Sequence, residues 1–100
     1  MSVLSAQDLA REIQSADLTD WQITEQGLQR VFIFKTFRQA FAFITQVALL
    51  AEKINHHPDW SNSYNRVAIT LISHDAGGIT MRDTSLAQKI DQVFAQFIVS

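Results

Sequence analysis

Apolar residues recur at helical spacing in three segments of the chain. Each segment opens with a hydroxyl residue, followed three positions later by a side chain that can cap in return, which satisfies free N–H groups at a helix start. The three pairs are Ser5 with Asp8, Thr36 with Gln39, and Thr80 with Asp83. The first apolar stripe ends near Ala16, the second stops before Pro58, and the third continues to Phe97. The pattern therefore predicts three helices.

Between these helices the apolar period changes to two, which is typical of strands. The four candidate strands cover residues 21–23, 28–35, 60–64 and 66–73, of which the third is the weakest. In the last strand Val67, Ile69 and Leu71 share one face. The predicted order is α-β-β-α-β-β-α. Two hairpins with helices on one face describe an α+β fold, a two-layer sandwich with a four-stranded antiparallel sheet.

The middle helix carries more apolar surface than one core face requires. Its main stripe comprises Phe37, Ala40, Phe41, Ile44, Val47, Ala48 and Ala51. Phe43 and Leu50, seven residues apart, lie off this stripe. A helix that is apolar most of the way round is usually buried on two sides. We therefore expect Phe43 and Leu50 to be buried between subunits; the alternative is a wide core within one subunit.

Composition narrows the class of protein. The 100 residues are 47% hydrophobic, and we expect residues 1–100 to form one domain. The absence of cysteine excludes disulfides and thiolate metal sites. A net charge of −2 argues against binding to nucleic acid. No apolar run approaches the ~20 residues of a membrane span, and the N-terminus lacks the regions of a signal peptide. We expect a cytoplasmic protein that binds no membrane.

All three histidines, His56, His57 and His74, fall within one short stretch. Three interpretations stay open on the residues alone. The histidines could bond nearby carbonyls at element ends. They could bind a metal with Glu52, Asp59 or Asp75, although the adjacent pair lacks the i, i+4 spacing of a helical metal site. They could form a metal-free acid–base site, because imidazole titrates near neutrality.

Longer motifs surround these histidines. The stretch from Glu52 to Trp60 contains His-His-Pro-Asp-Trp, and Tyr64-Asn-Arg-Val opens the last strand. Residues 73–80 read Ser-His-Asp-Ala-Gly-Gly-Ile-Thr, and Arg82-Asp83 follows. Together these motifs resemble the signature of the pterin-4a-carbinolamine dehydratases. The fold that the resemblance implies, a four-stranded antiparallel sheet backed by helices, agrees with the element order above.

The resemblance also implies a reaction, the dehydration of 4a-hydroxytetrahydropterin to quinonoid dihydropterin, which recycles the pterin of aromatic amino acid hydroxylases. It implies that His56, His57 and His74 are catalytic, by general acid–base chemistry without a metal or cofactor. We expect His56 and His74 to transfer protons and His57 to shape the pocket. The implied substrate-binding residues are Glu52, Asn55, Trp60, Ser73 and Asp75. Asn55 stands where family members often carry an acid, and Arg82 and Asp83 receive no role.

The resemblance further implies partners. Family members form tetramers, commonly through sheet edges and packed long helices, so we expect a homotetramer that acts beside an aromatic amino acid hydroxylase. Two alternatives remain. One is a protein-binding regulator, because animal members also stabilise dimers of a homeodomain transcription factor. The other is an enzyme that acts on a related pterin in molybdenum cofactor metabolism.

Overall fold

The computed structural model describes residues 2–98, and the helices and strands within them follow the predicted order α-β-β-α-β-β-α. The elements are α1 (Ala6–Ser15), β1 (Gln22–Thr24), β2 (Gly27–Ile33), α2 (Phe37–Ile54), β3 (Asp59–Ser63), β4 (Arg66–Leu71) and α3 (Met81–Ile98). The strand bounds differ from the prediction mainly at β2 and β4, which end two residues earlier than the alternating pattern does. None of the helices in this part of the chain is long and apolar enough to cross a membrane.

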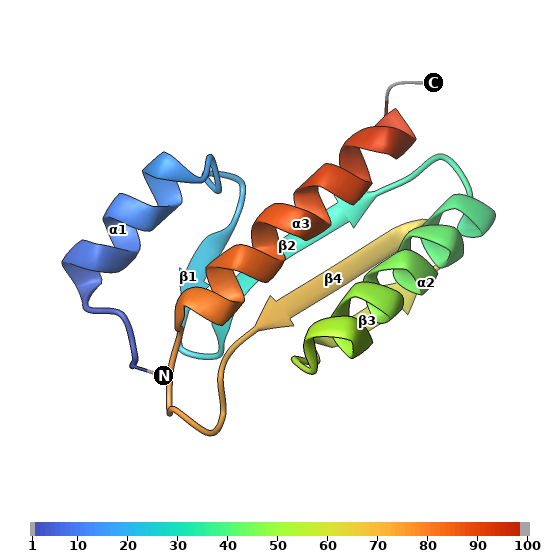
Figure 1. The fold of residues 1–100 in the computed structure, drawn as a ribbon. Helices are drawn as coiled ribbons and strands as arrows, with labels where there is room; N and C mark the ends of the chain where they lie inside the picture. The colour runs from blue at the N-terminus through green and yellow to red at the C-terminus, as the bar shows by residue number, and fades with distance from the viewer. Residues whose placement is uncertain (1, 99–100) are drawn as a thin grey trace.

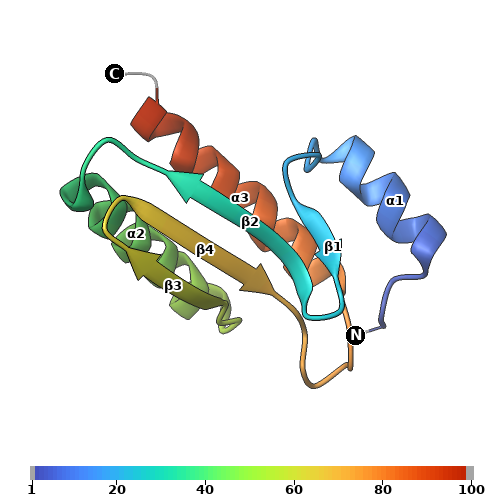
Figure 2. The ribbon, with the colours of Figure 1, turned by 180° about the vertical axis from the view of Figure 1, so that it is seen from behind.

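The strands form one antiparallel sheet in the order β1-β2-β4-β3. Helices α2 and α3 pack side by side on one face of the sheet, and α1 lies beyond β1 (Figure 1). Seen from behind, the opposite face has no helix from residues 2–98 over it (Figure 2). The fold is therefore the predicted two-layer α+β sandwich, with one face of the sheet open to solvent.

The three predicted caps form. The hydroxyls of Ser5 and Thr36 each accept a hydrogen bond of 3.1 Å from the backbone N–H three residues on. At the start of α3 the bond runs the other way, because the Asp83 carboxylate accepts from the Thr80 backbone N–H at 2.9 Å. This last cap is fully buried, since Thr80 and Asp83 are both 0% exposed. Burial distinguishes it from the other two.

The core lies between the sheet and the two long helices. As predicted, Val67, Ile69 and Leu71 of β4 face the helices and are buried. The helix α2 buries Ala40, Ile44, Val47 and Ala51 of the predicted stripe. It differs from the prediction at Phe43, which is buried, and at Phe41, which is 57% exposed. The cause is the aromatic cluster. The Phe43 ring lies 4.8 Å from that of Phe32 and 5.0 Å from that of Phe34. Packing against these two rings holds Phe43 in the core.

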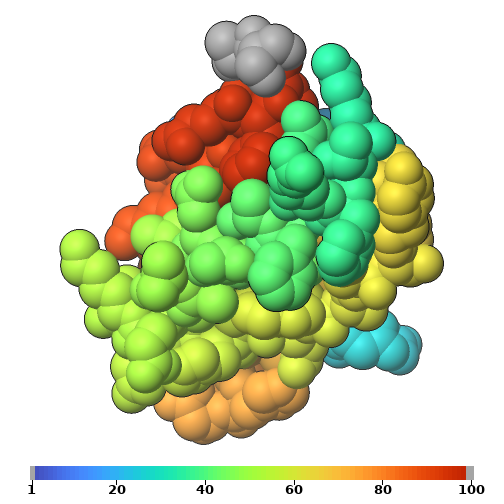
Figure 3. Space-filling model, turned by 90° about the vertical axis from the view of Figure 1, so that its right-hand side faces the viewer, coloured from blue at the N-terminus to red at the C-terminus, as the bar shows by residue number. Residues whose placement is uncertain are grey.

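The prediction that Phe43 is buried between subunits is therefore wrong, since its side chain is already covered within the chain. Leu50 is half-buried against the same core. The large apolar residues that α2 leaves exposed are Phe37, Phe41 and Leu49. Figure 3 shows this side of the molecule, with α2 in green and the yellow residues of the β3–β4 hairpin beside it.

Candidate active site

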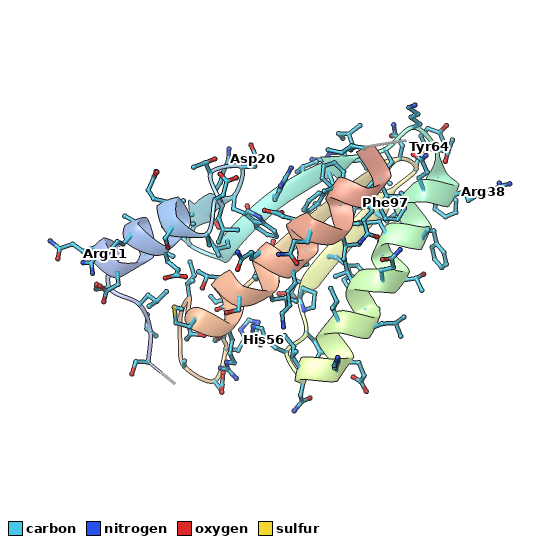
Figure 4. All side chains as sticks on the ribbon, turned by 45° about the horizontal axis from the view of Figure 1, so that its top comes forward. Arg11, Asp20, Arg38, His56, Tyr64 and Phe97 are labelled. Atoms are coloured by element: carbon cyan, nitrogen blue, oxygen red, sulfur yellow. The ribbon has the colours of Figure 1, made fainter. Side chains whose placement is uncertain are left out.

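The C-terminus of α2 separates the two adjacent histidines. Asn55 caps the helix in the left-handed conformation, with φ 54° and ψ 44°, a geometry that asparagine tolerates better than most residues. The next residue, His56, then donates its backbone N–H to the Ala51 carbonyl at 3.0 Å. This turn directs the His56 side chain inward, where it is 8% exposed, and leaves His57 exposed. Figure 4 shows His56 beside the first turn of α3.

The inward histidine contacts a buried carboxylate. His56 Nε2 lies 2.5 Å from Oδ1 of Asp83, which is 0% exposed. The other oxygen of the same carboxylate, Oδ2, accepts hydrogen bonds from the Ser73 hydroxyl and the Thr80 backbone N–H, each at 2.9 Å. Each oxygen of the carboxylate therefore has at least one donor, which is how a buried carboxylate is normally satisfied.

The protons of this network follow from its donors. The Arg82 backbone N–H donates to Thr80 Oγ1 at 3.2 Å, and the Ser73 hydroxyl donates to Asp83. The proton between the Thr80 and Ser73 hydroxyls, which are 2.8 Å apart, must then come from Thr80. When Asp83 is ionised its carboxylate accepts only, and His56 then donates from Nε2. In neutral His56 the lone pair is then on Nδ1.

That second nitrogen reaches the surface. His56 Nδ1 has no hydrogen-bond partner among residues 2–98, and it is not one of the buried polar atoms left unsatisfied there, so it is accessible. His56 lines a cavity of about 420 Å³. The cavity is lined by Asn55, His56, His57, Ile72, His74, Asp75 and Arg82. The structure thus brings all three histidines to one cavity, although they come from two segments of the chain.

The other two histidines lie in more open surroundings. His57 Nε2 is 2.9 Å from Oε1 of Glu52, one turn back on α2, and both side chains are exposed. His74 follows β4, and its Nε2 lies 3.8 Å from Oδ2 of Asp59 at the start of β3. That separation is an ion-pair distance when the imidazole is protonated, and it is too long for a hydrogen bond.

An arginine closes one side of the cavity. Arg82 Nη2 donates to Asp75 Oδ1 at 2.5 Å, and this hydrogen bond lowers the pKa of the Asp75 carboxyl below its ordinary value. The Nε atom of Arg82 is buried and has no partner among residues 2–98. Asp75 is thus ionised at neutral pH and fixes the guanidinium at the cavity wall.

The predicted site residues are only partly assembled. Asn55 and Asp75 line the cavity, Ser73 lies behind it against Asp83, and Glu52 reaches it only through His57. Trp60 is 41% exposed on the edge strand β3 and is not among the lining residues. Sequence reasoning gave no role to Asp83 and Arg82. One sequence feature singles out Asp83, its spacing from Thr80, but this spacing predicts only a helix cap.

A metal centre has no evident ligands here. Within residues 2–98, no three histidine, aspartate, glutamate or cysteine side chains are grouped closely enough to hold a metal ion together. The contacts that the histidines do make are single carboxylates, a different one for each ring.

Comparisons with known proteins identify the family. The family model for pterin 4 alpha carbinolamine dehydratase matches residues 2–93, so the chain belongs to that family of dehydratases, which are hydro-lyases. A relative from Mesorhizobium japonicum, provisionally named a pterin-4-alpha-carbinolamine dehydratase, is 52% identical over 81 residues, covering 79% of this chain and 83% of the relative. One from Rhodospirillum rubrum with the same name is 52% identical over 88 residues, 86% and 92% of the two chains.

A solved structure agrees with the fold. The crystal structure of a transcriptional coactivator/pterin dehydratase from Brucella melitensis matches with a TM-score of 0.85 and 37% identity. The match covers 92% of this chain and 98% of that one. The predicted family and fold class are confirmed by these findings.

Proposed function

We propose that this protein dehydrates 4a-hydroxytetrahydropterins to quinonoid dihydropterins by acid–base catalysis with its histidines. The observation that carries the proposal is the convergence of His56, His57 and His74 on one cavity, with the His56 ring held by the Asp83 carboxylate. A histidine whose one ring nitrogen is held by a carboxylate can exchange a proton with a substrate through its other ring nitrogen. The family membership supplies the pterin as the substrate class.

The reaction needs two proton transfers. A general acid protonates the 4a-hydroxyl as the C4a–O bond breaks, so that water leaves in place of hydroxide. A base takes the proton from the neighbouring ring nitrogen, and the electron pair of that N–H bond forms the new C=N bond. In this proposal neutral His56, which lines the cavity, takes that proton on Nδ1 and is the base. His74, which follows β4, is the acid in its protonated form.

The remaining cavity residues position the pterin. His57, held by Glu52, contributes to binding, and Asp75 and Arg82 supply an acceptor and donors for the pyrimidine edge. Trp60, predicted to bind the substrate, does not line the cavity and has no role in this proposal. In the cell, the product returns to a reductase and the reduced pterin to an aromatic amino acid hydroxylase.

The histidine variants test the mechanism. We expect His56→Ala and His74→Ala each to lower the dehydration rate, by ~10²–10⁴-fold for a positioned acid or base, while the protein stays folded. His57→Ala should raise KM at least as much as it lowers kcat. Stopped-flow decay of the 4a-carbinolamine measures the rates, and circular dichroism melts check the fold. Wild-type rates in a folded His56→Ala, His74→Ala double variant would refute the proposal.

The proposed chemistry needs no metal. Dialysis against a chelator should leave the dehydration rate unchanged, since the histidines supply both proton transfers. If the rate disappears after dialysis and returns with zinc, the acid–base mechanism is wrong.

We also propose that the protein assembles as a homotetramer. Two surfaces support this: the exposed apolar face of α2 and the outer edge of β3, which within residues 2–98 pairs only with β4. Two distinct self-complementary interfaces generate a closed tetramer. The α2 face also favours a second candidate function, the binding of another protein, and the Brucella melitensis relative is described as a coactivator as well as a dehydratase.

A further inference from the structure

A groove leads away from the histidine cavity between α2 and α3. A second hollow of about 240 Å³ shares His56 and Arg82 with the cavity, and continues to Ile54 and Lys89. A third, of about 350 Å³, shares Ile54 and Lys89 with the second and extends to Lys53. Neighbouring hollows share these lining residues, so the three lie in a row along α2 and α3. A ligand seated at the histidines can therefore extend a substituent along the helices.

The charges along this groove have one sign. Arg82, Lys89 and Lys53 line the two outer hollows, and no aspartate or glutamate of the described residues does. The chain as a whole has 10 acidic residues against 8 basic ones, so the groove differs from the average surface. Both lysines are exposed, and neither forms an ion pair with any other residue of the described chain. Their charges are thus available to a ligand.

The floor of the groove is apolar. Ile54 and Met81 line the hollow next to the histidines, and Leu50 and Val93 line the outer one. From Arg82 to Lys89 the helix α3 advances seven residues, or about 10 Å. The groove therefore offers an apolar path followed by two cations, which suits a short carbon chain that ends in an anion.

We propose that the preferred substrate is a pterin whose ring substituent ends in an anionic group, with phosphate as the chemical class that two lysines fit best. The pterin ring occupies the histidine cavity, and the substituent runs between α2 and α3 to Lys89 and Lys53. The inference rests on the proposed dehydratase function and names its substrate class. Lysines act here as point charges, which add attraction at low ionic strength and are screened by salt.

The test compares carbinolamines that carry neutral, carboxylated and phosphorylated side chains. We expect kcat/KM for the phosphorylated substrate to exceed that for the neutral one by roughly 2- to 5-fold per lysine at low ionic strength, the range of an exposed ion pair. The preference should fall with added salt. In the Lys53→Gln, Lys89→Gln variant the ratio of the two kcat/KM values should approach one. The carboxylated substrate shows whether charge or phosphate is recognised.

The control variant removes two cations elsewhere. The double variant Lys35→Gln, Arg11→Gln changes the net charge by the same amount, away from the groove. It should keep the preference for the phosphorylated substrate. Arg11 lies on α1 at the far side of the molecule (Figure 4). Equal kcat/KM for neutral and phosphorylated substrates, or a preference that survives loss of Lys53 and Lys89, would overturn the inference. Fluorescence titration with the oxidised pterins gives the ratio of Kd values independently. If no carbinolamine is turned over, the dehydratase proposal fails, and this ratio still tests the groove.

Discussion

At the scale of single residues, Asp83 performs two tasks with one carboxylate. Its Oδ2 caps α3 through the Thr80 N–H, and its Oδ1 holds the His56 ring. The first task belongs to the local sequence, since a residue three positions after a helix-start hydroxyl is placed for it. The second depends on α2 and α3 lying side by side, which brings His56 to a residue 27 positions away. The cap of α3 therefore holds the Asp83 carboxylate in place, and that carboxylate orients the His56 ring.

The Asp83→Asn variant should reverse the proton arrangement of His56. The amide oxygen would have to accept from Ser73 and Thr80, so the NH₂ group would face His56 Nε2 and donate to it. His56 would then carry its proton on Nδ1, and the cavity would meet a donor where the base should be. We expect the dehydration rate to fall ~10²–10⁴-fold in a folded protein. Nitrogen-15 NMR of the imidazole reports the tautomer directly.

A remote carboxylate provides the control for this variant and a prediction of its own. Asp91 of α3 accepts from Trp21 Nε1 at 3.0 Å and from Arg30 Nη1 at 2.8 Å. Asp91→Asn makes the same chemical change outside the cavity and should leave the dehydration rate unaltered. If both variants lose the rate equally, Asp83 has no special relation to His56.

Asp91 should also make stability depend on pH. Desolvation by burial raises its pKa above the ordinary value of 3.8, despite the opposing bonds from Trp21 and Arg30. Between the two values the folded state binds more protons than the unfolded state, so this group adds stability as the pH falls through its folded pKa. Asp91→Asn should cost about 1–3 kcal/mol at pH 7. Urea melts should show that the difference in the free energy of unfolding between the wild type and Asp91→Asn widens toward pH 4. A difference that narrows would contradict the raised pKa.

At the scale of elements, the sequence predicted which segments fold and most of the inner face of α2, but not that Phe43 lies inward in place of Phe41. The capping pairs and the helical spacing of apolar residues identified the three helices. The alternation of Val67, Ile69 and Leu71 identified the inner face of β4. In α2, two apolar series overlap, one through Phe41 and one through Phe43. Periodicity alone does not choose between them. The choice depends on the aromatic rings of β2, which are contacts across the core.

The candidate site shows the same division. The histidine motifs predicted one shared site, and Asn55 supplies the turn that lets His56 and His57 diverge. The carboxylate partner of His56 could not be derived from the sequence, because it depends on the packing of α2 against α3. The exposure of Trp60 could not be derived either, because β3 is an edge strand and alternation does not distinguish an edge from the middle of a sheet.

The β1–β2 hairpin depends on a glycine. Gly27 has φ +128°, and a Cβ there would lie 2.2 Å from the Leu71 backbone oxygen on β4. Gly77 also has positive φ, +82°, but nothing lies within 4 Å of its Cβ position. Gly77→Ala should therefore cost only conformational strain, on the order of 1 kcal/mol, and Gly27→Ala clearly more. Denaturation midpoints measure both; equal losses would show that the contact with Leu71 relaxes freely.

At the scale of the whole molecule, two of the exposed surfaces support the proposed assembly. On α2, Phe37, Phe41 and Leu49 are 47%, 57% and 67% exposed. On the sheet, β3 is exposed along its whole length, and its outer backbone groups are not paired with another described strand. Edges of this kind readily pair with another chain unless they are blocked by charge, proline or a covering element. The two surfaces consist of different residues, so each can be altered without the other.

This separation gives a graded prediction for Leu49→Lys. A lysine on the apolar face of α2 would have to bury a charge without a partner, so the α2 interface should be lost. The β3 edge is untouched, and the tetramer should therefore dissociate to a dimer and stop there. Light scattering measures the mass, and Gln14→Lys on the exposed side of α1 adds the same charge as a control. A monomeric wild type would contradict assembly altogether. A Leu49→Lys variant that keeps the wild-type mass would show that α2 is not an interface, and one that falls to a monomer would show that β3 does not hold a dimer alone.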